Sequence, residues 1–184
     1  AVATALAVAV AVPSEGRIPP WRRRVKDDTD PTLGFSLDVF AARRAGVRAD
    51  LDGCALVLGS NTNAYEGRYR ADSELFYLTG VTEPGAVAVF RPGGENGDFV
   101  LFVQPRNPEE ELWSGERLGP ERAGQVFGAD TTYGSDLLSE HLPKLLAGAE
   151  NAYFRIGTDS PVQSLVVGAL QTARLRGARK GVGP

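Results

Sequence analysis

The residues of this chain whose chemistry could serve a reaction are few, and they lie apart in the sequence. Glu109, Glu110 and Glu111 form an acidic run that could bind a cation, but adjacent carboxylates in a turn are usually solvated. The single histidine, His141, lies in an amphipathic segment, and a metal site built on histidine normally needs a second histidine or several convergent carboxylates. We therefore interpret His141 as a half-exposed structural residue.

The single cysteine, Cys54, offers no further chemistry. One thiol excludes an intramolecular disulfide and a cysteine-based zinc site, and the apolar residues after Cys54 supply no base or cation to activate it. The sequence also contains no GK[ST] phosphate loop, no GxSxG and no HExxH. From its own residues we expect this chain to have no catalytic residues, no metal ligands and no cofactor.

Length and composition predict one domain with one sizeable core. The chain has 184 residues, of which 42% are hydrophobic and 23% are charged. Its formal net charge of -3 disfavours a nucleic-acid partner, because such proteins usually carry a strong positive excess. We therefore expect no nucleic acid among its partners.

The two ends differ in composition from the middle of the chain. Residues 1–12 are almost wholly alanine, valine and leucine, too few to span a bilayer, and they suit either a signal-peptide core or a packed segment. Residues 13–32 are rich in proline and charge, which predicts an extended arm. We expect a tail and arm over residues 1–34, a domain over 35–176 and a linker over 177–184. We also expect no membrane span and a cytoplasmic protein, with export as the alternative.

The alternation of helical and strand-like segments predicts an α/β domain. Helices are expected at residues 37–51, 120–127, 135–146 and 161–176. Strands are expected at residues 55–59, 74–79, 86–90, 98–104 and 152–156, with a turn at 91–97 and an acidic turn at 108–111. Together they predict a mixed sheet of five to six strands, with antiparallel middle strands and flanking helices.

Two separated segments resemble the amino-terminal domain of Xaa-Pro aminopeptidases. Residues 69–84 read YRADSELFYLTGVTEP, and residues 111–119 read ELWSGERLG. Their order and spacing are compatible with that family, and the resemblance extends over about residues 39–156. One departure is that the family often carries Arg-Asn-x-Asp where this chain has Asn61-Thr62-Asn63-Ala64. The matching positions are Tyr69, Arg70, Ser73, Tyr77, Thr79, Gly80, Glu83, Pro84, Leu101, Phe102, Glu111, Trp113, Gly115, Arg117 and Gly119.

The resemblance implies a fold similar to creatinase and prolidase amino-terminal domains, with a ribonuclease H-like motif. It implies a parent metallopeptidase whose carboxy-terminal domain binds two divalent metal ions, commonly manganese, and releases the residue that precedes a proline. Those metal ligands have no counterpart in this chain, so the chain alone is expected to be inactive. Its implied roles are to shape and gate the active site and to support a homo-oligomer. The implied partners are peptides with proline at position 2 and its own catalytic domain.

The resemblance marks Trp113 and Arg117 as substrate-binding residues. In related enzymes the tryptophan that matches Trp113 reaches toward the proline pocket of a neighbouring subunit, and an indole offers a broad apolar face for proline. Structural alternatives stay open, because Trp113 also suits a core or an interface and Arg117 could pair with Glu111. Glycines of the two segments are interpreted as turn residues.

Two other functions are consistent with parts of the sequence. A stand-alone peptide-binding or assembly module could have kept this domain and lost the peptidase. A nuclease is a weaker alternative that rests on the ribonuclease H-like topology alone. Nuclease chemistry would need clustered carboxylates, and the spacing of Asp50, Asp52, Asp72 and Asp98 does not force them together.

Overall fold

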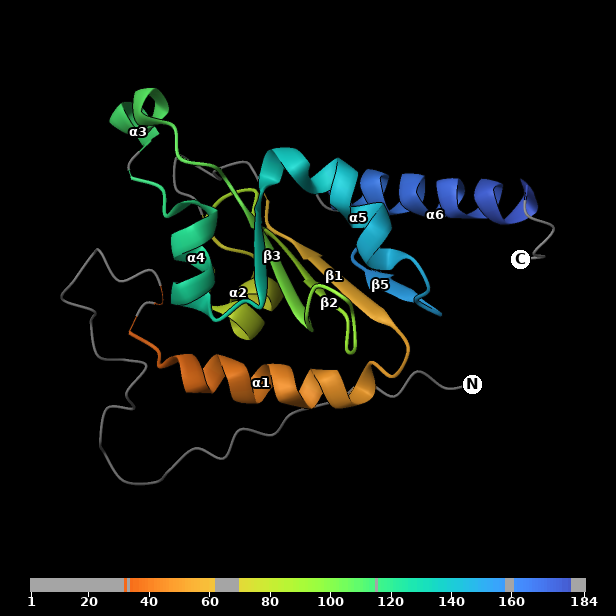
Figure 1. The fold of residues 1–184 in the computed structure, drawn as a ribbon. Helices are drawn as coiled ribbons and strands as arrows, with labels where there is room; N and C mark the ends of the chain where they lie inside the picture. The colour runs from red at the N-terminus through yellow and green to blue at the C-terminus, as the bar shows by residue number, and fades with distance from the viewer. Residues whose placement is uncertain (1–31, 33, 62–69, 115, 158–160, 180–184) are drawn as a thin grey trace.

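The computed structural model describes residues 32, 34–61, 70–114, 116–157 and 161–179, without the side chains of residues 113, 114 and 173–179. Helices and strands alternate along most of the chain (Figure 1). In chain order the elements are α1 (Leu37–Asp50), β1 (Ala55–Gly59), α2 (Ser73–Thr79), β2 (Val87–Phe90), β3 (Phe99–Val103), α3 (Pro108–Ser114), α4 (Gly119–Phe127), β4 (Thr131–Gly134), the 3-10 turn η2 (Ser135–Leu137), α5 (Leu138–Leu146), β5 (Ala152–Phe154) and α6 (Val162–Arg179).

The strands form one mixed sheet of five strands in the order β4-β3-β2-β1-β5. The strand β2 lies between β1 and β3 and pairs antiparallel with both. The two outer strands pair parallel, β5 with β1 and β4 with β3. This arrangement confirms the predicted α/β class and the predicted mixed sheet with antiparallel middle strands.

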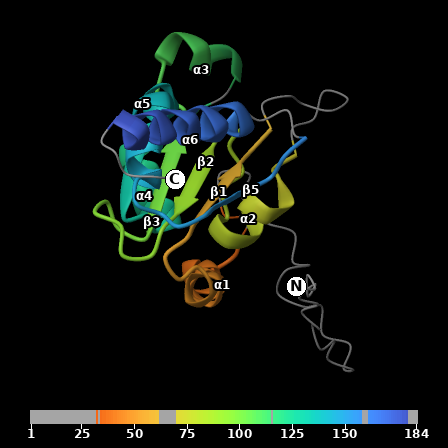
Figure 2. The same cartoon turned by 90° about the vertical axis from the view of Figure 1, so that its right-hand side faces the viewer.

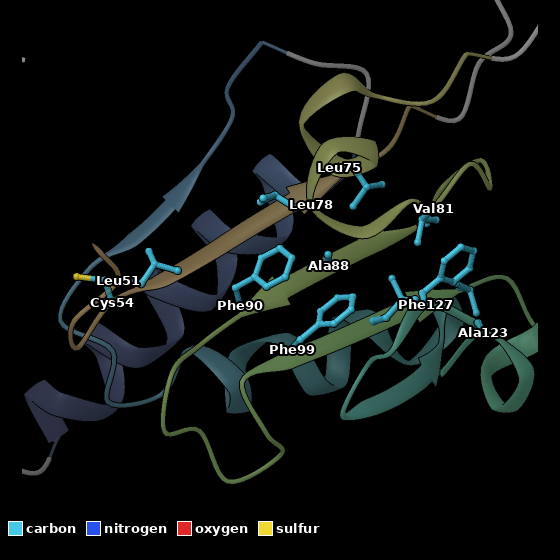
Figure 3. Close-up of a cluster of buried hydrophobic side chains, with 13 residues drawn as sticks. Leu51, Cys54, Leu75, Leu78, Val81, Ala88, Phe90, Phe99, Ala123 and Phe127 are labelled. Atoms are coloured by element: carbon cyan, nitrogen blue, oxygen red, sulfur yellow. The ribbon is translucent and has the colours of Figure 1, made fainter. Parts of the chain in front are cut away.

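Helices cover both faces of the sheet, which separates two hydrophobic clusters. On β3, Leu101 faces the cluster formed with α2 and α4, whereas its neighbour Phe102 faces the cluster formed with α5 and α6. Successive side chains of a strand point to opposite faces, so an unbroken apolar run is what a strand covered on both sides requires. Figure 2 shows α1 and α6 on opposite sides of the sheet. Figure 3 shows the first cluster, where Phe90 and Phe99 stack with ring centroids 4.9 Å apart.

One predicted element is wrong. The segment predicted as a strand at residues 74–79 is the helix α2. Leu75, Leu78 and Thr79 are buried, whereas Tyr77 is 49% exposed. Buried positions three and four residues apart belong to one face of a helix, whereas a strand would bury alternate residues. The aromatic composition of the segment favours a strand, but its burial period is helical.

Two elements are additional to the predictions. The helix α3 takes the place of the acidic turn predicted at residues 108–111, and β4 is a further strand whose partner is β3. The helix predicted at residues 135–146 begins with the turn η2, and α6 continues to Arg179. The remaining predicted helices and strands agree with the structure to within two residues at each end.

Several predictions concern residues that the structure does not describe. They are the tail and most of the arm, within residues 1–31, and the end of the linker, at 180–184. Gly115 and residues 62–69, which include most of the stretch that differs from the family pattern, are also outside the described residues. Among the described residues, no helix combines the length and the apolar character that a membrane crossing needs.

Candidate functional site

The first matching segment forms α2 and the turn after it. Asp72 caps α2 by accepting a hydrogen bond from the backbone N–H of Glu74 at 3.2 Å. Gly80 ends the helix in the left-handed conformation, with φ of 76°. A Cβ at this position would lie 2.7 Å from the ring of Phe40, so both the backbone angle and the available space require glycine. The chain therefore ends α2 at Gly80 and continues toward Glu83.

Buried hydrogen bonds fix the chain between α2 and β2. The hydroxyl of Thr79 donates to the carbonyl one helical turn earlier at 2.6 Å and accepts from the N–H of Val81 at 3.1 Å. Val81 is fully buried. On the other side of Glu83, the side-chain amide of Gln104 donates to the carbonyl of Pro84 at 3.2 Å. The backbone that carries Glu83 is therefore held on both sides.

The second matching segment forms α3 and the loop to α4, and we call residues 106–118 the α3 segment, of which residue 115 is not described. The side chain of Asn107 caps α3 by accepting a hydrogen bond from the N–H of Glu109 at 3.2 Å. Figure 1 shows α3 beyond the end of β3 and away from the sheet. Leu112 on this helix is 81% exposed. The α3 segment thus presents side chains outward from this domain.

Two arginines hold α3, one before it and one after it. Arg106 binds Glu111, with 3.0 Å between Nη2 and Oε2, and this contact holds the pKa of the Glu111 carboxyl below its usual value. Arg117 lies 2.6 Å from Oε2 of Glu110. At the start of α4, Gly119 has φ of 71°, and a Cβ there would lie 2.8 Å from Cγ of Arg106. The close packing of Gly119 against Arg106 fixes the return of the chain to the domain.

Glu83 connects the two matching segments. Its Oε1 accepts a hydrogen bond from the backbone N–H of Leu118 at 3.3 Å, and its Oε2 is buried. Burial raises the pKa of the Glu83 carboxyl above its usual value, and the Leu118 hydrogen bond and the positive charge of Arg117 oppose this shift only in part. A partly buried carboxylate therefore lies between the turn after α2 and the α3 segment.

The structure describes the side chain of only one of the two predicted substrate-binding residues. The side chain of Arg117 is 19% exposed, and its guanidinium pairs with Glu110 rather than with Glu111. Glu111 is bound by Arg106, which approaches from the other end of α3. Trp113 belongs to α3, but its side chain is outside the described part of the structure. Glu83 matches the family pattern, but nothing in the sequence signals that it contacts residue 118.

The other candidate residues have structural contacts. His141 is partly buried, and its ring centroid lies 4.1 Å from that of Tyr133. Cys54 is buried in the first hydrophobic cluster. Asp98 pairs with Arg48 at 2.6 Å. Across the described ranges, no three or more His, Cys, Asp or Glu side chains are grouped as metal ligands.

A cavity of about 560 Å³ lies beside the first matching segment. Phe35, Phe76 and Tyr77 give it an aromatic lining, and Arg43 and Arg70 add positive charge. The guanidinium of Arg43 lies 4.2 Å from the ring centroid of Tyr77 and donates to the Tyr77 carbonyl at 2.9 Å. This surface suits binding of apolar or anionic groups rather than acid–base chemistry.

Comparison with known proteins places the two segments in one family. Residues 40–154 match the family described as "Aminopeptidase P, N-terminal domain". The Xaa-Pro aminopeptidase of Escherichia coli is 31% identical over 115 residues, which cover 62% of this chain and 26% of that protein. Intermediate cleaving peptidase 55 of Saccharomyces cerevisiae is 29% identical over 143 residues, which cover 72% of this chain and 28% of that protein. The chain thus spans little more than a quarter of the length of these relatives.

Solved structures agree with this match. Pseudomonas aeruginosa aminopeptidase PepP has a TM-score of 0.72 and 30% identity, covering 82% of this chain and 35% of that one. Zn-substituted E. coli aminopeptidase P in complex with product has a TM-score of 0.72 and 26% identity, covering 81% of this chain and 35% of that one. The predicted resemblance is confirmed, because the family match extends over more than half of the chain and includes both segments. The chain belongs to the aminopeptidase P family and corresponds to its amino-terminal domain.

Proposed function

We propose that this chain is the non-catalytic amino-terminal domain of a metal-dependent Xaa-Pro aminopeptidase, which releases the residue preceding a proline. The observation that carries the proposal is the match of residues 40–154 to the aminopeptidase P amino-terminal domain. Relatives that are named Xaa-Pro aminopeptidase support the activity of the parent protein. The proposed domain plan remains a tail and arm over residues 1–34, the domain over 35–176 and a linker over 177–184.

The chemistry of the reaction belongs, in this proposal, to a second domain. The described residues of this chain offer no set of ligands for a metal ion, so they do not fit the two divalent ions, commonly manganese, that the reaction is proposed to use. Those ions and their ligands are assigned to the catalytic domain of the parent protein. The parent polypeptide is proposed to be cytoplasmic, and this chain alone is proposed to be inactive.

The contribution of this chain is to shape and gate the active site. The α3 segment supports this role, because it extends beyond the sheet and carries outward-facing side chains. We assign substrate contacts to Trp113, through stacking of its indole on proline, and to Arg117, whose side chain is 19% exposed. The exposed Leu112 suits a further contact with the catalytic domain or with a second copy in a homo-oligomer.

An activity assay of the parent polypeptide tests this proposal. The full-length protein is incubated with manganese and two tripeptides that differ only in proline or alanine at position 2, and release of the first residue is measured. We expect release from the proline peptide alone, loss of release with a chelator, and no release by the 184-residue chain.

Two results of this assay would contradict the proposed function. A parent protein that binds proline peptides without cleaving them would overturn the peptidase function. It would favour a stand-alone peptide-binding or assembly module. Proline-independent cleavage would also contradict the proposed specificity.

A further inference from the structure

We infer that Glu83 is a positioning residue that holds the α3 segment against the domain through the backbone N–H of Leu118. This inference rests on the proposed function for its effect on substrate, but its structural part can be tested without activity. The two family segments are separated by more than twenty-five residues, since residue 84 ends one and residue 111 begins the other. Glu83 joins them.

The contacts run from the core of the domain to α3. The turn that carries Glu83 is fixed by the Thr79–Val81 hydrogen bond before it and by the Gln104 contact with Pro84 after it. From this fixed turn, the carboxylate accepts the N–H of Leu118 at 3.3 Å. A side chain on a rigid backbone can hold a loop in place because little of its own motion must be restrained.

Arg117, the residue before Leu118, continues the connection to α3. It lies 2.6 Å from Oε2 of Glu110, a residue of α3, and its positive charge favours the ionised form of Glu83. Leu118, which Glu83 binds, directly follows Arg117 in the chain, so the Glu83–Leu118 hydrogen bond and the Arg117–Glu110 pair are adjacent. Loss of the Glu83 charge would remove its attraction to Arg117 and leave the Arg117–Glu110 pair in place.

The carboxyl group of Glu83 is partly shielded from water. The Oε2 atom of Glu83 is buried, and burial raises the pKa of this carboxyl above its usual value. The ionised side chain therefore costs folding free energy while it attracts Arg117. The buried charge lowers the stability of the fold, whereas its contacts hold the α3 segment in place. The effects of Glu83 on the position of α3 and on the stability of the domain can therefore be separated by experiment.

The test compares Glu83→Ala and Glu83→Gln with Glu109→Gln, which changes an exposed carboxylate on α3. Amide hydrogen exchange is measured on the 184-residue chain. We expect Glu83→Ala to speed exchange at Leu118 and in α3 by about tenfold, the effect of losing a charge-assisted hydrogen bond. Amides of α5 should keep their rates. Glu83→Gln keeps an oxygen that can accept the Leu118 N–H, so it should restore protection at Leu118 but not in α3.

Kinetics of the parent protein add a functional measurement. Glu83→Ala is expected to raise KM for a proline peptide by about tenfold, with kcat changed by no more than about twofold, because position rather than chemistry is altered. Glu109→Gln should leave both unchanged. If the unmodified parent cleaves no such peptide, the proposed function fails while the exchange result still decides the role of Glu83.

Two results would overturn the inference. Exchange of α3 that is unchanged in Glu83→Ala, or accelerated equally throughout the domain, would leave Glu83 with packing alone. If Glu83→Ala does not fold, Glu83→Gln is combined with Arg117→Gln. Because Arg117→Gln also removes the pair with Glu110, positioning through this connection predicts that the double variant exchanges α3 no faster than Arg117→Gln alone, whereas multiplied effects would refute it.

Discussion

Burial of the Glu83 carboxyl links the pH of the solution to the stability of the domain. Its pKa lies above the usual value, so the folded chain binds this proton more tightly than the unfolded chain does. The protonated Glu83 side chain therefore stabilises the folded chain fully below the pKa of the unfolded state. This stabilisation is lost as pH rises through the higher pKa of the folded state. Because glutamine stays neutral, we expect Glu83→Gln to have a higher Tm than the unmodified chain at about pH 7, with a difference that shrinks toward about pH 4.

Thermal unfolding followed by circular dichroism over this pH range measures the effect. Glu109→Gln is the matched control, and its Tm should follow the unmodified chain at each pH. A Glu83→Gln variant that is less stable near neutral pH would show that the Arg117 and Leu118 contacts outweigh the cost of burying the charge.

Single residues also show what the sequence can and cannot predict about the site. The resemblance identified the positions of Glu83 and Arg117, because they recur in the family pattern. It could not identify their partners, since Glu110 and Glu111 are adjacent in the sequence and yet pair with different arginines, Glu110 with Arg117 and Glu111 with Arg106. Pairings of this kind depend on side-chain positions in three dimensions, which composition and spacing do not contain.

Among the helices and strands, α2 is joined to the turn that carries Glu83 by Gly80. Gly80→Ala would impose a Cβ at a φ of 76° and 2.7 Å from the Phe40 ring. We expect it to lower the free energy of unfolding by about 2–4 kcal/mol, from backbone strain and overpacking together.

The control for Gly80→Ala is Gly46→Ala in α1. A Cβ at position 46 would meet no atom within 4 Å. Alanine is the better helix former, so this variant should be more stable by about 0.5–1 kcal/mol. Urea unfolding compares the two variants. Equal effects of the two substitutions would contradict the steric role of Gly80.

Helices and strands that local sequence determines are predicted well, whereas those that depend on packing or on distant strand pairing are not. The helix α1 is predicted almost to its ends from its apolar periodicity, and in the structure Ser36 caps its start. The prediction fails at α2, where Phe76, Tyr77 and Leu78 favour a strand by composition but are placed by packing on a helix. The short strand β4 has a partly buried pattern and owes its conformation to pairing with β3, a contact distant in sequence.

The start of α3 has a signal in the sequence. Asn107 precedes Pro108, and the three acidic residues follow at once. A capping side chain, a proline at the first helical position and acidic residues in the first turn favour a helix start. With seven residues, α3 is too short for apolar periodicity to reveal it.

At the scale of the whole molecule, one sheet is shared by two hydrophobic clusters. Leu101 and Phe102 are adjacent on β3, are fully buried, and belong to different clusters. We expect Leu101→Ala and Phe102→Ala each to lower the free energy of unfolding by about 2–5 kcal/mol. Because both clusters pack on the same strands, each variant should unfold in a single transition.

Fluorescence and circular dichroism curves measured on the same sample check this cooperativity. The two curves should coincide for each variant. Curves that separate for one variant would show that one layer of helices unfolds independently of the other.

We propose that this domain completes the substrate site of a proline-specific peptidase. The most direct measurement is kcat/KM of the parent protein on an Xaa-Pro tripeptide, for Trp113→Ala and Trp113→Phe against the unmodified enzyme. We predict a loss of about tenfold or more for alanine and partial recovery for phenylalanine, which keeps an aromatic face for proline. Equal kcat/KM for all three proteins would contradict a substrate contact from this domain.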